Sequence, residues 1–231
     1  MAWPYLPHLP HLPRAVDVVL SDRFVGRWRR LATRATHGTV VEFGFGSGLN
    51  LPHYPPQVHT VLAVEPDDEA WDAALQSGRI DAFAAARGQD PQDAVRRVGL
   101  DAQSVDLPDH AADAVVSTWS LCSIPDPAAA LAQAGRLLAP GGRLHLAEHG
   151  LAPSPRVAAV QRRIQPTWGR LAGGCHLDRD IPALLRAAGF DPAPLHRGYA
   201  APTAPLRPWT WFAAGAAARS QAEPPVDRPG D

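Results

Sequence analysis

Three glycines at alternate positions, Gly44, Gly46 and Gly48, follow a short apolar run in the segment VVEFGFGSGLN. Such a loop lets the backbone approach a ligand closely, because no side chain intervenes. Glu42 lies two residues before the first glycine, where its charge would repel a pyrophosphate and attract an ammonium or sulfonium group. The nicotinamide fingerprint G-x-G-x-x-G would also need glycine at Leu49. The segment therefore predicts a ligand with a positive end.

A second carboxylate, Glu65, ends the next predicted strand. A carboxylate at this place accepts hydrogen bonds from both ribose hydroxyls of a nucleoside. S-adenosylmethionine (SAM) is an adenosine derivative that has a positive end and lacks a pyrophosphate, so it meets both requirements. Asp101, after a third strand, would then receive the adenine amino group, with Ala102 against the ring.

Four further side chains are candidates for contact with the molecule that accepts the methyl group: His149, His176, Cys122 and Cys175. We hypothesise that His149 or His176 is catalytic and takes the acceptor's proton, although either imidazole could instead have a structural role. Cys122 is expected to be a small buried side chain. Cys175 could be a nucleophile or a metal ligand, but no complete ligand set is visible, so no metal site is predicted.

Apolar strands alternate with helical segments, which predicts an α/β fold with a doubly wound, mostly parallel sheet. Ligands of such sheets bind outside the carboxyl ends of the strands, where the two glutamates stand. Strands are expected at residues 39–46, 60–66, 95–100, 112–120, 143–150, 190–199 and 208–215. Helices are expected at residues 15–36, 67–75, 127–138, 155–172 and 178–188, the last with Asp178 as its N-cap, and an ambiguous Ala-rich segment spans 76–92.

The length of 231 residues suits one such domain, which we place at 37–216, after an N-terminal arm with helices at 1–36 and before a disordered tail at 217–231. All 22 basic residues are arginine, which excludes lysine-dependent phosphate loops and pyridoxal chemistry. A net charge of -1 argues against a nucleic-acid partner. No long apolar run, signal peptide or disulfide framework is evident, so no membrane span and a cytoplasmic location are expected.

Residues 38–150 resemble the class I SAM-dependent methyltransferases through VVEFGFGSGLN, AVEPD, LDAQSVDLPDHAADAVVS and LLAPGGRLHLAEHG. The resemblance implies a Rossmann-like sheet of seven strands with a reversed last strand, and SAM as the cofactor. It assigns the glycines and Glu42 to the methionine part of SAM and Glu65 to the ribose. It also assigns Pro66, Asp101 and Ala102 to the adenine, and Thr118 and Trp119 to the closure of the pocket.

The segments NLPHY, SLCSIPD, EHG and GCHLDR resemble a narrower group, the thiol methyltransferases, with the quinone-biosynthesis C-methyltransferases as close relatives. Asn50 begins the first of these segments and is included among the predicted SAM-binding residues. The resemblance implies a small, fairly apolar acceptor, either a thiol or a quinone-like or phenolic molecule. A non-catalytic SAM-binding module and a nicotinamide-dependent oxidoreductase are the alternatives, and the oligomeric state is not predicted.

Overall fold

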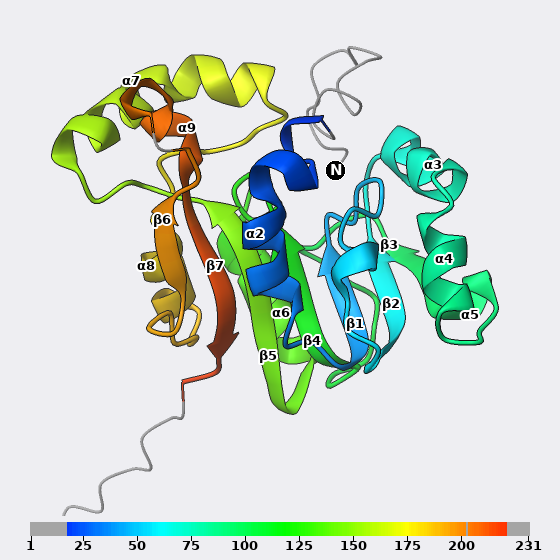
Figure 1. The fold of residues 1–231 in the computed structure, drawn as a ribbon. Coiled ribbons are helices and arrows are strands. Elements are labelled where there is room, and N and C mark those ends of the chain that lie inside the picture. The colour runs from blue at the N-terminus through cyan, green and yellow to red at the C-terminus, as the bar shows by residue number, and fades with distance from the viewer. Residues whose placement is uncertain (1–17, 202, 221–231) are drawn as a thin grey trace, which may run out of the picture.

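A computed structural model describes residues 18–201 and 203–220 (Figure 1). Residues 1–17 of the predicted N-terminal arm and most of the predicted tail lie outside these ranges. The strands are β1 (Gly38–Phe43), β2 (Val58–Val64), β3 (Val95–Gly99), β4 (Ala112–Thr118), β5 (Leu138–His149), β6 (His196–Tyr199) and β7 (Trp211–Ala218). The helices are α2 (Asp22–Thr33), α3 (Asp68–Gln76), α4 (Arg79–Ala85), α5 (Pro91–Ala94), α6 (Pro127–Leu137), α7 (Pro155–Leu171), α8 (Ile181–Ala187) and α9 (Arg207–Thr210), with 3-10 turns at Leu51–His53 and Ala204–Leu206.

The seven strands form one sheet in the order β3-β2-β1-β4-β5-β7-β6. Strands β1 to β5 pair in parallel, whereas β7 is antiparallel to both β5 and β6. The reversed strand is visible in Figure 1, where the arrow of β7 points away from the carboxyl ends of its neighbours. The predicted fold, six parallel strands with a reversed seventh, is confirmed.

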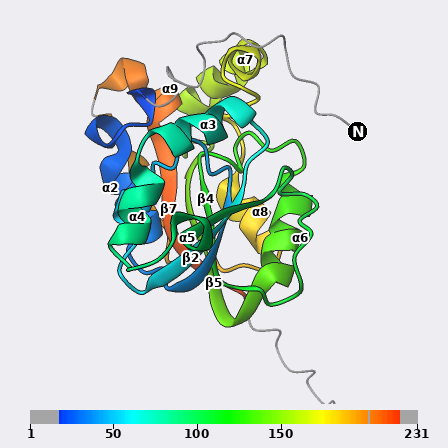
Figure 2. The ribbon, with the colours of Figure 1, turned by 90° about the vertical axis from the view of Figure 1, so that its right-hand side faces the viewer.

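Helices cover both faces of the sheet. Figure 2 shows α2 and α4 on one side of the strands and α6 and α8 on the other. The central strand β1 is buried on both faces, and Val40 and Val41 are fully inaccessible to solvent. This burial explains why the strand consists of consecutive apolar residues and does not alternate with polar ones. Helix α7 lies beyond the carboxyl ends of the strands (Figure 1).

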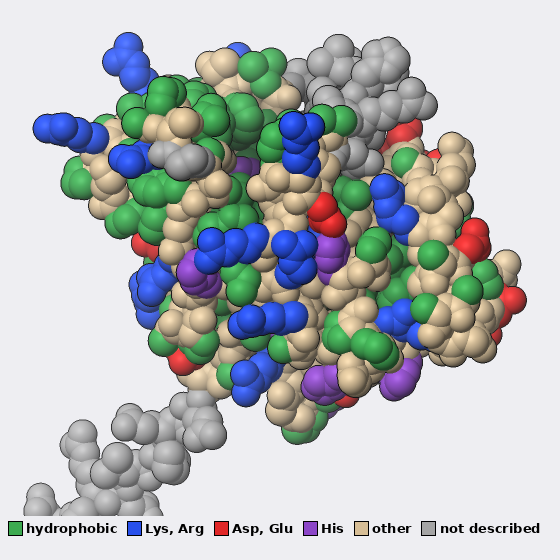
Figure 3. Space-filling model, in the orientation of Figure 1, with side chains coloured by type: hydrophobic (Ala, Val, Ile, Leu, Met, Phe, Trp, Pro, Cys, Tyr) green, Lys and Arg blue, Asp and Glu red, His purple; other side chains and the backbone are tan. Residues whose placement is uncertain are grey.

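Helix α2 packs its apolar side against the sheet and turns its arginines outward. Val25, Trp28 and Ala32 are buried in a cluster with Phe212 and other residues of the sheet. The arginines form part of a band of basic side chains over α2 and the neighbouring strands (Figure 3). Arg29 is the exception, because it lies on the same helical face as Val25 and Ala32 and is buried.

Several predicted boundaries differ from the observed ones near the C-terminus. Helix α8 begins at Ile181 and is capped by Asp180, which accepts a hydrogen bond from the Ala183 amide, so the predicted cap at Asp178 is wrong. Strand β6 is shorter than predicted. Strand β7 begins after α9 and continues to Ala218, past the predicted boundary at 216, because it pairs with β5 from His149 back to Arg143.

None of the helices among the described residues is long and apolar enough to cross a membrane.

Candidate functional site

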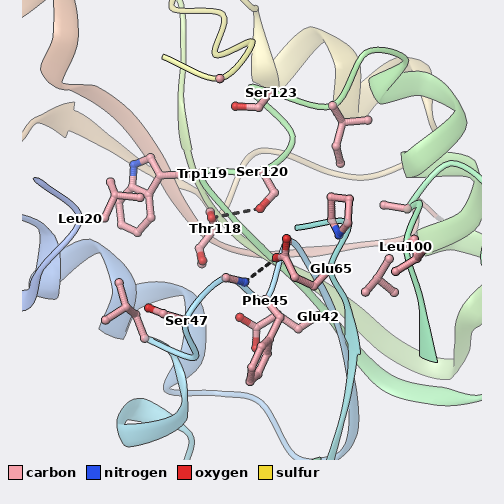
Figure 4. A pocket seen from close by; sticks show the side chains of 18 of the residues that line it. Leu20, Glu42, Phe45, Ser47, Glu65, Leu100, Thr118, Trp119, Ser120 and Ser123 are labelled. Carbon is pink, nitrogen blue, oxygen red and sulfur yellow. Dashed lines mark hydrogen bonds between the residues drawn. The ribbon is translucent and has the colours of Figure 1, made fainter. Parts of the chain in front are cut away.

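A cleft of about 220 Å³ opens at the carboxyl ends of β1, β2 and β4 (Figure 4). This is the place where a doubly wound sheet binds its ligands, because the loops after the strands diverge there. Eight of the eleven predicted SAM-binding residues line the cleft: Glu42, Gly44, Gly46, Glu65, Pro66, Ala102, Thr118 and Trp119. The other three, Gly48, Asn50 and Asp101, do not belong to its lining.

The glycine loop after β1 forms the floor of the cleft, and it needs glycine for two different reasons. Gly44 has a φ of +70°, and a Cβ there would lie 2.1 Å from Oγ of Ser120. Gly46 has a φ of +58°, but a Cβ there would meet no atom within 4 Å. The first glycine thus permits close packing within the protein, and the second leaves open space beside the backbone.

Glu42 lies beneath this loop with its carboxylate almost completely buried. Its Oε1 accepts a hydrogen bond from Nδ2 of Asn50 at 2.7 Å, and its Oε2 accepts one from the Tyr54 hydroxyl at 2.5 Å. Burial raises the pKa of Glu42 to about 7, in spite of these two hydrogen bonds and the nearby charge of Arg29. The carboxyl group therefore changes its charge near neutral pH, and a cation in the cleft would favour its ionised form.

Asn50 supports Glu42 from behind the cleft wall. Its side-chain amide also donates to Oγ1 of Thr118 at 3.0 Å, and its Oδ1 accepts a hydrogen bond from Nη1 of Arg29 at 2.6 Å. Arg29 is not among the residues that the sequence predicts for the site. The spacing of Arg29 from Val25 and Ala32 was the available signal, since residues at these intervals share a helical face.

Glu65 is the first residue after β2 and faces the glycine loop across the cleft. Its Oε2 accepts a hydrogen bond from the Gly46 amide at 2.6 Å, and its Oε1 accepts one from the Asp67 amide at 2.9 Å. Burial raises the pKa of this carboxyl above its usual value. A carboxylate has about four lone-pair sites, so two remain for the hydroxyls of a ribose.

One end of the cleft is apolar. Leu100 lies at this end (Figure 4), and the lining also includes Pro66 and Ala102. Asp101 stands between two of these residues, but its Oδ1 already accepts two hydrogen bonds of 2.8 Å from Gln103, one from the backbone and one from the side chain. The predicted contact of Asp101 with adenine stays a prediction.

The opposite end of the cleft is formed by Trp119, the first residue after β4, together with Leu20 (Figure 4). Trp119 has a φ of +54°, an uncommon conformation for a residue with a large side chain, and strain of this kind concentrates at functional sites. Its ring packs edge-on against Phe212, with 5.7 Å between the centroids. Its buried indole N–H has no hydrogen-bond partner among the described residues.

The charge and the hydrogen-bonding groups of the cleft suit SAM. Two carboxylates stand where the cationic methionine part and the ribose would lie, and an apolar slot would take the adenine. Ser47 and Trp119 each have a buried polar atom that lacks a partner among the described residues, and both line the cleft. Such orphaned groups are expected where a ligand completes the hydrogen bonds.

Neither histidine predicted to be catalytic lines the cleft. Nε2 of His149 lies 3.1 Å from the backbone oxygen of Trp209. His176 lies near the surface, with its Nδ1 at 3.7 Å from Oδ1 of Asp178, and partial burial lowers its pKa. A role for either imidazole in taking a proton from the acceptor stays a prediction.

The structure does bring His149 together with both cysteines of the chain. Its Nδ1 lies 3.8 Å from Sγ of Cys122 and 3.6 Å from Sγ of Cys175, and the two sulfurs are 3.6 Å apart. The contact with Cys122 lowers the pKa of the Cys175 thiol, while the same contact and burial raise the pKa of Cys122. Cys122 is buried as predicted, but its proximity to His149 and Cys175 was not predicted.

Comparison with known proteins supports the family suggested by the sequence. A model of the methyltransferase domain matches residues 20–194, more than half of the chain. Thiol S-methyltransferase TMT1B of Rattus norvegicus is 32% identical over 162 residues, which are 66% of this chain and 59% of that protein. The Homo sapiens TMT1B is 31% identical over 167 residues, 68% of this chain and 62% of that protein. The chain thus spans about three fifths of the length of these curated relatives.

Solved structures share the fold at lower identity. The Burkholderia thailandensis 1,6-didemethyltoxoflavin-N1-methyltransferase, with bound S-adenosylhomocysteine, has a TM-score of 0.63 and 18% identity, covering 92% of this chain and 85% of that chain. A putative methyltransferase from Bacillus halodurans has a TM-score of 0.59 and 20% identity, covering 76% of this chain and 72% of that chain. Both comparisons agree with the sheet described above.

Proposed function

The chain belongs to the class I SAM-dependent methyltransferases, and from this premise we propose that it methylates the sulfur of a small, fairly apolar thiol. The family and its relatives identify SAM as the methyl donor. The observation that carries the choice of acceptor is the chemistry of the cleft lining. Of the described residues that line it, only Arg29, Glu42 and Glu65 are ionisable, and all three are engaged on the donor side.

On the donor side, we assign Glu42 to the charged methionine part of SAM and Glu65 to the ribose hydroxyls. The open space beside Gly46 would accommodate the methionine part against the backbone. Gly44, Thr118 and Trp119 would complete the walls of the site, and the slot at Leu100 would hold the adenine. Gly48 and Asn50 would act indirectly, by shaping the loop and by orienting the carboxylate of Glu42.

A thiol suits a cleft without a base, because its pKa near 8.5 gives a useful fraction of thiolate at neutral pH. A phenol or alcohol acceptor ionises at higher pH and would need a general base beside it. No histidine is present among the described residues of the lining. The names of the curated relatives, which are thiol S-methyltransferases, point the same way.

The protein's contribution to the reaction would be orientation and exclusion of water. SAM supplies a methyl group that is already activated, so the thiolate needs only an in-line approach to it. Trp119 and Leu20 line the end of the cleft away from Leu100 (Figure 4) and would bind the apolar part of the acceptor. The indole N–H of Trp119, at the same end, is buried and has no hydrogen-bond partner among the described residues.

A matched pair of acceptors tests this proposal directly. We expect benzyl mercaptan, incubated with the full chain and SAM, to yield S-adenosylhomocysteine and a product one methyl group heavier. Benzyl alcohol, which differs only in oxygen for sulfur, should give no product above the level of a heat-treated control. Equal turnover of a phenol or a reduced quinone, or turnover of these alone, would contradict the thiol assignment and favour the quinone-like alternative.

A binding measurement tests the donor site separately. Calorimetric titration should show micromolar binding of S-adenosylhomocysteine and none of NADH, and Glu65→Ala should abolish the binding, because it removes the acceptors for the ribose hydroxyls. Binding without turnover of any acceptor would support the non-catalytic module, and binding of NADH would support an oxidoreductase. The cytoplasmic location and the absence of a nucleic-acid partner stay predictions.

A further inference from the structure

We propose that Cys122, His149 and Cys175 bind a thiophilic divalent cation of the Zn²⁺ type at a site beside the cleft. These are the three side chains among the described residues whose ligand atoms gather, all within 4.8 Å of one another. The first argument is distance. A tetrahedral Zn²⁺ ion has Zn–S bonds of about 2.3 Å and Zn–N bonds of about 2.0 Å, which separate two sulfurs by about 3.8 Å and a sulfur from a nitrogen by about 3.5 Å. The observed separations are 3.6 Å between the sulfurs, and 3.6 and 3.8 Å from nitrogen to sulfur.

The second argument is the orientation of the imidazole. A backbone carbonyl can only accept a hydrogen bond, so the contact of His149 Nε2 with the Trp209 oxygen places the ring proton on Nε2. Nδ1 then presents its lone pair to the two sulfurs. Histidines that bind metals are oriented in this way, with the other ring nitrogen donating to a carbonyl or carboxylate.

The third argument is charge. Two thiolates and a neutral imidazole would exactly balance a divalent cation, which is the condition for placing an ion in a buried site. Cys122 and Cys175 belong to an apolar cluster with Trp119, Leu177 and Phe212, which would limit the access of water. The carboxyl group of Glu148 lies nearby but is not available as a ligand, because its oxygens accept hydrogen bonds from Ser117 and from three backbone amides.

The ion would join two segments that lie far apart in the sequence. Cys122 is in the loop that contributes Trp119, Ser120, Ser123 and Ile124 to the cleft, and Cys175 follows the lining residue Gly173. The two segments already contact each other through a hydrogen bond from the His176 amide to the Cys122 oxygen, at 2.7 Å. A bound metal would therefore fix the wall at one end of the cleft. The three described ligands leave a fourth tetrahedral position for water or another small ligand.

The test is titration of the reduced full chain with Co²⁺, a spectroscopic substitute for Zn²⁺, under anaerobic conditions. We expect one equivalent to bind with the absorption of a tetrahedral ion and a thiolate-to-cobalt band, and Zn²⁺ to displace it. At a Zn²⁺ concentration a thousand times the Kd, the unfolding midpoint should rise by about 8–16 °C. Because this readout needs neither SAM nor an acceptor, its result is independent of the proposed function.

Two variants form a test and its matched control. Cys175→Ser should abolish the thiolate-to-cobalt band and the thermal shift, whereas His176→Ala, one residue away, should retain both. If Cys175→Ser does not fold, alkylation of the wild-type chain decides the matter, since Zn²⁺ should protect both thiols. The assignment is overturned if the reduced chain binds no metal, if Cys175→Ser binds it as the wild type does, or if Zn²⁺ leaves both thiols equally reactive.

Discussion

Glu42 couples the charge of the donor site to pH. Its pKa of about 7 arises from burial, so at pH 6 roughly nine molecules in ten would have to lose a proton before the carboxylate could pair with a cationic ligand. We expect the affinity for SAM to rise about tenfold from pH 6 to pH 8, because the fraction of ionised Glu42 rises by that factor. Calorimetric titration at both pH values, in buffers of different ionisation heat, would also detect the released proton.

The control for this prediction is Glu42→Gln, which has nearly the same shape but no titratable group. It should bind SAM more weakly at pH 8 and with little dependence on pH. If the wild type binds SAM equally well at pH 6 and pH 8, Glu42 does not face the positive end of the ligand, and its role would be confined to the hydrogen bonds with Asn50 and Tyr54.

At the level of elements, Trp28 is the largest of the buried side chains that attach helix α2 to the sheet. Trp28 is 3% exposed and packs edge-on against Phe212, with 5.4 Å between the ring centroids. We expect Trp28→Ala to lower the free energy of unfolding by about 3–5 kcal/mol, since it leaves a cavity between the helix and the sheet. Urea denaturation followed by circular dichroism would measure the change.

The matched control on the same helix is Arg30→Ala. Arg30 is exposed, so its removal should change the free energy of unfolding by no more than about 0.5 kcal/mol. A comparable loss in both variants would mean that the helix is stabilised by its charged surface and not by the buried tryptophan.

For the molecule as a whole, His145 makes stability sensitive to acid. This histidine is buried in β5, and its Nδ1 lies 2.9 Å from the backbone oxygen of Ala32 at the end of α2. Burial lowers its pKa to about 4 from an ordinary value of 6.5. The unfolded chain therefore binds the proton more tightly than the folded one, and stability is lost as the pH falls from 6.5 towards 4.

The size of this effect can be measured by comparison with His145→Gln. When the pH is lowered from 7.5 to 4.5, the free energy of unfolding of the wild type should fall by about 2.5 kcal/mol relative to that of the variant. Comparison with the variant is needed because Glu42 acts in the opposite direction. Its raised pKa favours the folded state as the pH falls from 7 to 4.5. If the difference in free energy of unfolding between wild type and variant does not change with pH, the buried imidazole gains its proton as readily in the folded chain as in the unfolded one, and the prediction is wrong.

The sequence alone determined the order of the seven strands and of most helices, the glycine loop, and the two carboxylates near the ends of β1 and β2. These features are local, because the spacing of apolar residues and the position of a side chain after a strand follow from the chain itself. The short helix α9 was not predicted, because its residues were assigned to the last strand. The carboxyl ends of parallel strands share one edge of the sheet, so eight predicted residues converge on the cleft without further information.

Only the tertiary structure decided which distant side chains meet. In the folded chain Arg29 is buried against Asn50, and His149 and His176 lie outside the cleft lining. The tertiary structure also gathered Cys122, His149 and Cys175, although 27 and 26 residues separate the histidine from the two cysteines. Such contacts depend on how the loops fold back over the sheet, and the periodicity of the sequence does not predict the conformation of these loops.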